Sequence, residues 1–158
     1  MSGRVLEFRV NALPPKRTAQ QKGAFVRNGR VHFFTKAAIR AQEENTVALV
    51  LSKLPADWQP LSGALSLELR FCFPFRKSEK KAVVRAGQEV PHDVRGDLDN
   101  LCKGFLDALG TAGVFHDDAQ VSVLSAVKVW GPSAYFTVRV AQIGPAPVEL
   151  PHQGLLKY

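Results

Sequence analysis

Residues 95–120 read RGDLDNLCKGFLDALGTAGVFHDDAQ, and this stretch decides both how the chain folds and where its chemistry lies. Its apolar side chains recur at helical spacing, at Leu98, Leu101, Phe105, Ala108 and Leu109. That spacing predicts a helix over residues 98–110, with Gly110 at its end. One pair of aspartates, Asp97 and Asp99, opens the helix, and a second pair, Asp117 and Asp118, follows it. Four carboxylates therefore gather around one helix in a chain of net charge +7.

Alternating apolar and polar residues predict strands on either side of this helix. The predicted strands cover residues 4–10, 63–73, 119–130 and 134–142. Residues 24–34 predict a β-hairpin, because Asn28 and Gly29 both tolerate the positive φ of a two-residue turn. Residues 74–96 are interpreted as one long polar loop, of the kind that is usually functional or disordered.

A second helix is predicted over residues 36–53, with Thr35 as its N-cap and Pro55 beyond its end. Its expected buried positions are Ile39, Val47, Val50 and Leu51. The order is thus strand, hairpin, helix, strand, helix, strand, strand. It predicts an α+β fold, in which two main helices pack on a small mixed β-sheet.

The chain has the length of one domain, which we place at residues 1–143. Residues 144–158 form a proline-containing tail that we expect to be poorly ordered. No apolar run is long enough to span a membrane, and residues 1–10 lack an apolar signal core. We therefore expect a cytoplasmic protein that does not engage a membrane. In that setting its two cysteines, Cys72 and Cys102, are expected to be free thiols.

The positive charge of the chain is clustered. Residues 1–40 contain nine Lys or Arg residues against the single acid Glu7. Residues 76–85 add five more basic residues against Glu79. With a pI near 9.7, this clustering predicts a polyanionic partner, with nucleic acid as the leading candidate. The alternative is a basic surface that is merely solvated.

The four aspartates have two interpretations. Carboxylates at the start of a helix are favoured by its macrodipole, so Asp97 and Asp99 could simply cap it. That interpretation does not explain Asp117 and Asp118. If the following strand returns them to the start of the helix, the carboxylates share one pocket and repel one another unless a cation neutralises them. A hard divalent ion fits such oxygen ligands, and Mg²⁺ is the usual choice beside phosphates.

Three further side chains, Lys103, His116 and His92, also have a structural and a functional interpretation. Lys103 lies four residues after Asp99 on the same helical face. It either forms an intrahelical ion pair or places its ammonium group beside a phosphate. His116 and His92 are interpreted as ordinary loop histidines, although His116 adjoins the acidic pair.

The segments GDLDNLCKGFLDAL and GVFHDDAQV together resemble the RusA family of Holliday junction resolvases. The resemblance is close over residues 95–123, and the segment Pro14-Pro15-Lys16 near the N-terminus is also similar. It implies a homodimeric, RusA-like, Mg²⁺-dependent endonuclease in which Mn²⁺ can replace Mg²⁺, with no small-molecule cofactor. Such an enzyme acts in DNA recombination and repair. It binds four-way DNA junctions and nicks two opposing strands symmetrically.

Carried over position by position, the resemblance implies metal-binding and catalytic roles for Asp97, Asp99 and Asp118. It makes Asp117 the neighbouring metal-site acid and Lys103 the catalytic lysine. Asn100 and Gln120 also occupy motif positions and are given orienting or structural roles.

The basic residues of the loop at residues 74–96 match no family position, and residues 16–18 do not align as a family pattern. We nevertheless expect DNA contacts from the basic segments, at Lys16, Arg17, Arg76, Lys77, Lys80, Lys81, Arg85 and Arg95.

Three alternatives remain open at this point. The chain could be another metal-dependent, structure-selective DNA nuclease, acting on flaps or duplexes. It could be a non-catalytic basic DNA-binding module whose acids only cap a helix. It could also be a structural dimer that uses residues 97–100 as a subunit contact.

Overall fold

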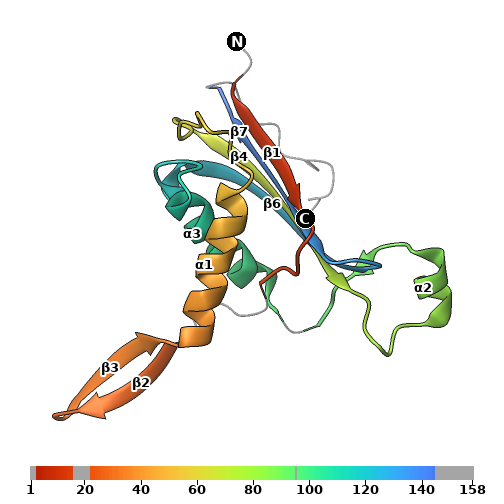
Figure 1. Cartoon of the computed structure of the whole chain (residues 1–158), viewed down its shortest axis with the longest axis horizontal. Coiled ribbons are helices and arrows are strands. Elements are labelled where there is room, and N and C mark those ends of the chain that lie inside the picture. The colour runs from red at the N-terminus through yellow and green to blue at the C-terminus, as the bar shows by residue number, and fades with distance from the viewer. Residues whose placement is uncertain (1–2, 16–21, 95, 145–158) are drawn as a thin grey trace, which may run out of the picture.

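This computed structural model describes residues 3–15, 22–94 and 96–144, and its elements follow the predicted α+β order (Figure 1). The strands are β1 (Val5–Val10), β2 (Lys22–Arg27), β3 (Arg30–Thr35), β4 (Leu65–Pro74), β5 (Val90–Pro91), β6 (Val121–Gly131) and β7 (Tyr135–Gln142). The helices are α1 (Ala37–Leu51), α2 (Lys81–Ala86), α3 (Leu98–Thr111) and the short 3-10 helix η1 (Asp118–Gln120).

Five strands form the main sheet in the order β1-β7-β4-β6-β5. The central strand β4 pairs antiparallel with β7 and parallel with β6, so the sheet is mixed as predicted. Parallel neighbours need a long crossover, and α3 lies within it. Because of this topology, the chain runs along α3 and then returns along β6.

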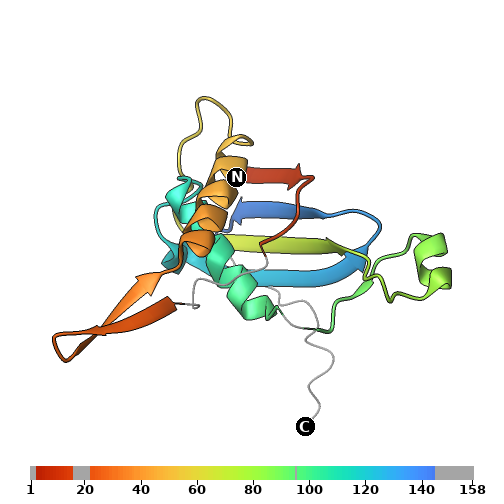
Figure 2. The same cartoon turned by 60° about the horizontal axis from the view of Figure 1, so that its bottom comes forward.

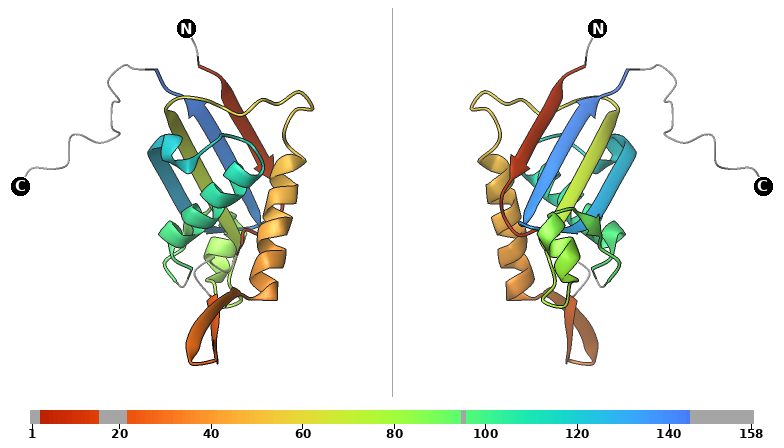
Figure 3. Two further views of the ribbon diagram at one scale, coloured as in Figure 1. Left: turned by 90° about the vertical axis from the view of Figure 1, so that its left-hand side faces the viewer. Right: turned by 90° about the vertical axis from the view of Figure 1, so that its right-hand side faces the viewer.

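Two helices, α1 and α3, cover one face of the main sheet (Figure 3). The alternation of β4 explains why: Leu67, Leu69 and Phe71 are buried, whereas the intervening Glu68 is exposed. The ring of Phe105 on α3 packs edge-on against Phe71, at 4.8 Å between ring centroids. The core therefore lies between the sheet and these two helices.

The hairpin and its turn are confirmed. β2 and β3 pair only with each other, and Asn28 and Gly29 have φ values of 52° and 71°. The hairpin projects away from the main sheet, beyond the N-terminal end of α1 (Figures 1 and 2).

Two expectations for α1 are wrong. Its N-cap is Lys36, because Thr35 still pairs with Lys22 at the end of β3. Leu51 is 51% exposed, whereas Ile39 and Val50 are buried as predicted. The inner face of the helix also buries Thr46, whose hydroxyl donates a hydrogen bond to the main-chain oxygen of Gln42.

The ends of α3 and β6 also differ from expectation. The helix passes through Gly110 and ends at Thr111, and Gly113 is the residue with positive φ. Residues 119 and 120, the first two of the predicted strand, belong to η1 instead, and β6 starts at Val121. The predicted loop over residues 74–96 contains α2 and the two-residue strand β5.

Several expectations fall outside the described residues. They concern the tail at residues 145–158 and the basic residues Lys16, Arg17 and Arg95. Within the described ranges, no helix combines the length and apolar character that crossing a membrane requires. Cys72 and Cys102 are both buried and free, as predicted.

Candidate functional site

The first acidic pair stands at the N-terminal end of α3. Asp97 is the N-cap residue, but its side chain makes no capping hydrogen bond. Its carboxylate instead accepts a hydrogen bond of 3.4 Å from the side-chain amide of Asn100. Asp97 and Asp99 are both exposed. The capping interpretation therefore does not account for the Asp97 carboxylate, and Asn100 has the orienting position expected of it.

A lysine from β6 holds the segment that leads into Asp97. The ammonium group of Lys128 donates hydrogen bonds to the main-chain oxygens of Val94 at 2.9 Å and Gly96 at 2.6 Å. Lys128 and Asp97 line the same open pocket. The sequence interpretation missed Lys128. The sequence signal that could have identified Lys128 is the alternation of β6, which places it on the same inward-facing side as Ala126 and Trp130.

His92 forms part of the same pocket and is not an ordinary loop histidine. It is buried and stacks on Trp130, with 3.8 Å between ring centroids and 9° between the planes. Its main-chain N–H donates to the oxygen of Lys128. Burial lowers the pKa of His92, and the charge of Lys128 lowers it further. The neutral ring thus serves as packing beneath the loop.

The second acidic pair belongs to η1. The carboxylate of Asp117 accepts a hydrogen bond of 2.8 Å from the main-chain N–H of Ala119 and so caps this turn. Gln120 completes the cap, because its amide oxygen accepts from the N–H groups of His116 and Asp117. Its amide nitrogen donates to main-chain oxygens of the preceding loop, those of Leu61 and Gly63.

The expected structural role of Gln120 is therefore confirmed. The side chain of Asp118 makes no hydrogen bond or ion pair with any described residue, and it is exposed, as is His116. The carboxylate of Asp118 is thus available to a ligand.

The two acidic pairs lie at opposite ends of α3. The helix has 14 residues, which at a rise of 1.5 Å per residue is about 21 Å. The chain then returns along β6, where Lys128 lines the same pocket as Asp97. Val121, at the start of β6, is seven positions before Lys128, and in an extended strand this corresponds to about 23 Å between the two residues. The expectation that all four carboxylates meet within one chain is therefore not met. In the described ranges, no three His, Cys, Asp or Glu side chains group as metal ligands.

The donor chemistry of each pair nevertheless suits a hard cation. Asp97 and Asp99 offer exposed carboxylate oxygens, which are the ligands that Mg²⁺ prefers. Asp117 and Asp118 offer the same chemistry at the other end of the helix. Each end of α3 therefore presents carboxylate oxygens that could hold part of a metal's coordination shell.

Lys103 is exposed on α3, one helical turn after Asp99. The ion pairs of the described residues do not include one between these two side chains. The interpretation of Lys103 as half of an intrahelical ion pair is therefore not supported. Its ammonium group is open to solvent on the helix that also presents Asp99.

The basic residues around α2 divide into two kinds. Arg76 contacts the protein, through Glu79 at 3.2 Å and by lying over the ring of Trp130, 5.4 Å from its centroid. The remaining basic side chains of this segment are exposed, at Lys77, Lys80, Lys81 and Arg85. These four can reach a phosphate backbone without giving up a protein contact.

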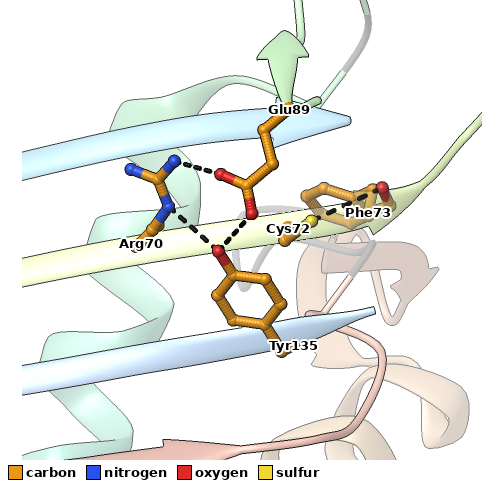
Figure 4. A network of polar contacts seen from close by, with 5 residues as sticks. All are labelled: Arg70, Cys72, Phe73, Glu89 and Tyr135. Atoms are coloured by element: carbon orange, nitrogen blue, oxygen red, sulfur yellow. Dashed lines mark hydrogen bonds and ion pairs between the residues drawn. The ribbon is translucent and has the colours of Figure 1, made fainter. Parts of the chain in front are cut away.

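A polar network fixes the segment that follows α2 to the main sheet (Figure 4). Glu89 accepts hydrogen bonds from Arg70 on β4 and from the hydroxyl of Tyr135 on β7. Arg9 lies over the ring of Tyr135, at 3.6 Å from its centroid. The network thus joins β1, β4 and β7 to the chain that carries α2.

This network shifts the pKa values of its members. Burial acts to raise the pKa of Glu89, but hydrogen bonds from Arg70 and Tyr135 outweigh it, and the pKa of Glu89 is lowered overall. Burial is also the main reason why the pKa of Cys72 rises to about 11. At neutral pH, Glu89 is therefore ionised and Cys72 is a protonated thiol.

Comparison with known proteins gives two matches. The sequence model of the family described as Endodeoxyribonuclease RusA matches residues 14–141. A curated relative, the crossover junction endodeoxyribonuclease rusA of Enterobacteria phage HK97, is 39% identical over 82 residues. That match covers 50% of this chain and 62% of the relative, so it spans less than two thirds of the relative's length.

Proposed function

The chain belongs to the RusA endodeoxyribonuclease family, and from this membership we propose that it is a metal-dependent endonuclease that resolves four-way DNA junctions. The observation that carries the proposal is the exposed pair Asp97 and Asp99 at the start of α3, within the matched residues. The name of the phage relative supports the same substrate class. The net charge of +7 suits a polyanion.

The proposed metal ligands are Asp97 and Asp99 from one chain, with Asp118 and its neighbour Asp117 from a second chain. The length of α3 supports this division, because one chain holds the two pairs about 20 Å apart. Mg²⁺ is the proposed ion, and Mn²⁺ can replace it. When bound, the ion would lower the pKa of a water molecule and offset charge on the attacked phosphate.

The free edge of β6 offers a way to build the dimer. In the described chain, β5 pairs with this edge of β6 only at Val129 and Trp130. The rest of the edge carries no charged residue before Lys128, and Leu124 is 46% exposed. A long uncharged edge strand readily pairs with another chain.

Antiparallel pairing of β6 with its copy would satisfy twofold symmetry. If the axis passes near Leu124, the start of one strand lies beside the end of the other. Asp118 of the partner subunit then lies near Lys128 and Asp97. Two identical composite sites result, one for each of two opposing DNA strands.

The chain's own side chains have distinct roles in this proposal. Asp97, oriented by Asn100, and Asp99 hold the ion at the scissile phosphate. Lys103 places its ammonium group beside a non-bridging phosphate oxygen and offsets the charge that develops there. Lys128 acts as a positioning residue, since it fixes the loop that leads into Asp97.

DNA affinity would come mainly from phosphate contacts, and it would fall with added salt. The exposed residues of and before α2 are proposed to contact phosphates, at Lys77, Lys80, Lys81 and Arg85. Arg76 would contact a phosphate only after its ion pair with Glu79 breaks. Lys16, Arg17 and Arg95 stay proposed contacts that lie outside the described residues.

The test is to incubate the protein with synthetic four-way junctions, flaps and duplexes, with Mg²⁺ or with EDTA. Paired nicks at opposing positions of the junction, only with Mg²⁺, are expected. Asp97→Asn and Asp118→Asn should each abolish cleavage while junction binding persists. Cleavage of flaps or duplexes in preference to junctions would favour another structure-selective nuclease. Equal binding with EDTA and no nicking would favour a DNA-binding module.

A further inference from the structure

The β2–β3 hairpin has two chemically different faces. Its register places Phe25 opposite His32, Gly23 opposite Phe34, and Arg27 opposite Arg30 on one face. On the other face lie the apolar residues Ala24, Val26, Val31 and Phe33. The hairpin projects from the body of the molecule, so both faces are open (Figures 1 and 3).

The first face carries a row of aromatic rings. Phe25 stacks on His32, with 5.2 Å between ring centroids and 17° between the planes. Phe34 lies beside Phe25, at 6.1 Å, and occupies the space over Gly23 where a side chain would otherwise stand. Phe25 and Phe34 remain 48% and 46% exposed. A flat, exposed aromatic surface of this kind suits stacking with another ring.

The same face ends in two arginines that lie directly across from each other. Arg27 and Arg30 are opposed across the ladder, an arrangement that destabilises a hairpin when no anion is present. The sequence contains no Asp or Glu between residues 8 and 42, and the ion pairs of the described residues include neither arginine. Both side chains are exposed. An anionic partner would remove this repulsion.

We propose that the aromatic and cationic face of the β2–β3 hairpin is a nucleic-acid binding site, distinct from the acidic site at α3. Unpaired bases stack on Phe25, His32 and Phe34, and adjacent phosphates bind Arg27 and Arg30. Stacking is tolerant of sequence, because every base has a flat face. This inference rests on the proposed function for its ligand, since a four-way junction offers bases at the branch point that are readily unstacked.

The position of the hairpin agrees with this role. The hairpin and α2 project on opposite sides of the molecule, and the N-terminal end of α3 lies between them (Figures 1 and 2). DNA that crosses Asp97 can therefore contact the lysines of α2 on one side and the hairpin on the other. The hairpin thus becomes a second arm of one DNA-binding surface.

The experiment measures binding in EDTA to three fluorescent probes: a four-way junction, a single-stranded oligonucleotide and a fully paired duplex. Phe25→Ala is expected to weaken binding to the single strand and the junction on the order of tenfold, as loss of one stacked base would. Binding to the duplex should change far less. Phe25→Trp keeps a stacking surface and should keep the affinity.

The charge contribution is tested by R27Q combined with R30Q, which leaves the Asn28-Gly29 turn intact. The slope of log affinity against log salt should fall by roughly 1.5 to 2 for the junction, as expected for two lost phosphate contacts. The matched control is Val26→Thr on the opposite face of the same strand, which should leave the affinity for all three probes unchanged.

Two results would overturn the proposal. The first is wild-type affinity and salt slope in both the Phe25→Ala and the arginine variants. The second is a change of molar mass in these variants, measured by light scattering, while the DNA affinity of each dimer stays the same. That result would make the hairpin a subunit contact. Neither result bears on the proposed nuclease function, which fails only if the wild-type protein does not nick junctions with Mg²⁺.

Discussion

The ammonium group of Lys128 donates a 2.6 Å hydrogen bond to the main-chain oxygen of Gly96. This bond joins the end of β6 to the residue directly before Asp97. A second hydrogen bond from the same ammonium group reaches Val94. The position of the first acidic pair thus depends on a lysine that is about 30 residues further along the chain.

Replacing Lys128 by Met should impair cleavage more than binding. Without the ammonium group, the segment at Val94 and Gly96 loses two hydrogen bonds, and Asp97 loses its fixed position. Displacement by about 1 Å can cost up to a hundredfold in rate. We expect a ten- to hundredfold slower single-turnover cleavage of junctions at saturating enzyme. Lys53→Met, at an exposed lysine beyond α1, is the control, and equal rates for the two variants would contradict the role of Lys128.

Two substitutions on α3 should separate stability from catalysis. Phe105 is fully buried between Phe71 and Phe136, so Phe105→Ala should lower the free energy of unfolding by about 3–5 kcal/mol. Lys103 is exposed, so Lys103→Ala should change the free energy of unfolding by less than about 0.5 kcal/mol. The same substitution should abolish most junction cleavage. Urea denaturation and cleavage assays on both variants check this. A Lys103→Ala protein with full activity would remove Lys103 from the site.

The polar network around Glu89 should give a pH-dependent contribution to stability. The pKa of Glu89 is lowered in the folded protein, so its contribution is present above the ordinary carboxyl pKa and is lost as the pH falls through the folded value. Glu89→Gln should therefore lower the free energy of unfolding at pH 7 by about 1–2 kcal/mol. The difference from wild type should shrink in acid. A difference that does not vary between pH 7 and pH 3 would be inconsistent with this account.

Gly131 leaves room for the thiol of Cys72. A Cβ atom at Gly131 would stand 2.6 Å from Cys72 Sγ and 3.2 Å from Glu89 Cγ. Gly131→Ala should therefore destabilise the fold, at a cost of about 1–3 kcal/mol for overpacking. Adding Cys72→Ala should recover part of this loss in a double-mutant cycle. Strictly additive free energies of unfolding would show that the two residues do not interfere.

Much of the fold followed from periodicity. The alternation of β4 and the helical spacing of α3 predicted both elements, because each buries one regular face in the core. The Asn28-Gly29 turn was predictable because positive φ restricts the residue types there. Asp97 occupies the N-cap position of α3, where carboxylates are favoured, although its side chain makes no capping hydrogen bond.

The missed features depend on contacts that are distant in sequence. α2 and β5 have six and two residues, and Glu89 fixes their segment through Arg70 and Tyr135 on other strands. Lys128 was missed for the same reason, since its partners lie 32 and 34 residues away. The separation of the two acidic pairs follows from the direction of the chain along α3 and β6, which spacing alone does not reveal.

The most direct test of the central claim, a metal site shared between two chains, uses purified heterodimers of differently tagged subunits. One heterodimer joins an Asp97→Asn chain to an Asp118→Asn chain. If sites are shared, one intact site forms from the two unaltered aspartates, and we predict nicking of a four-way junction at about half the wild-type rate. The matched heterodimer joins a wild-type chain to a chain with both substitutions, and it should be inactive. Activity only in this second heterodimer would show that each site lies within one chain and would contradict the account.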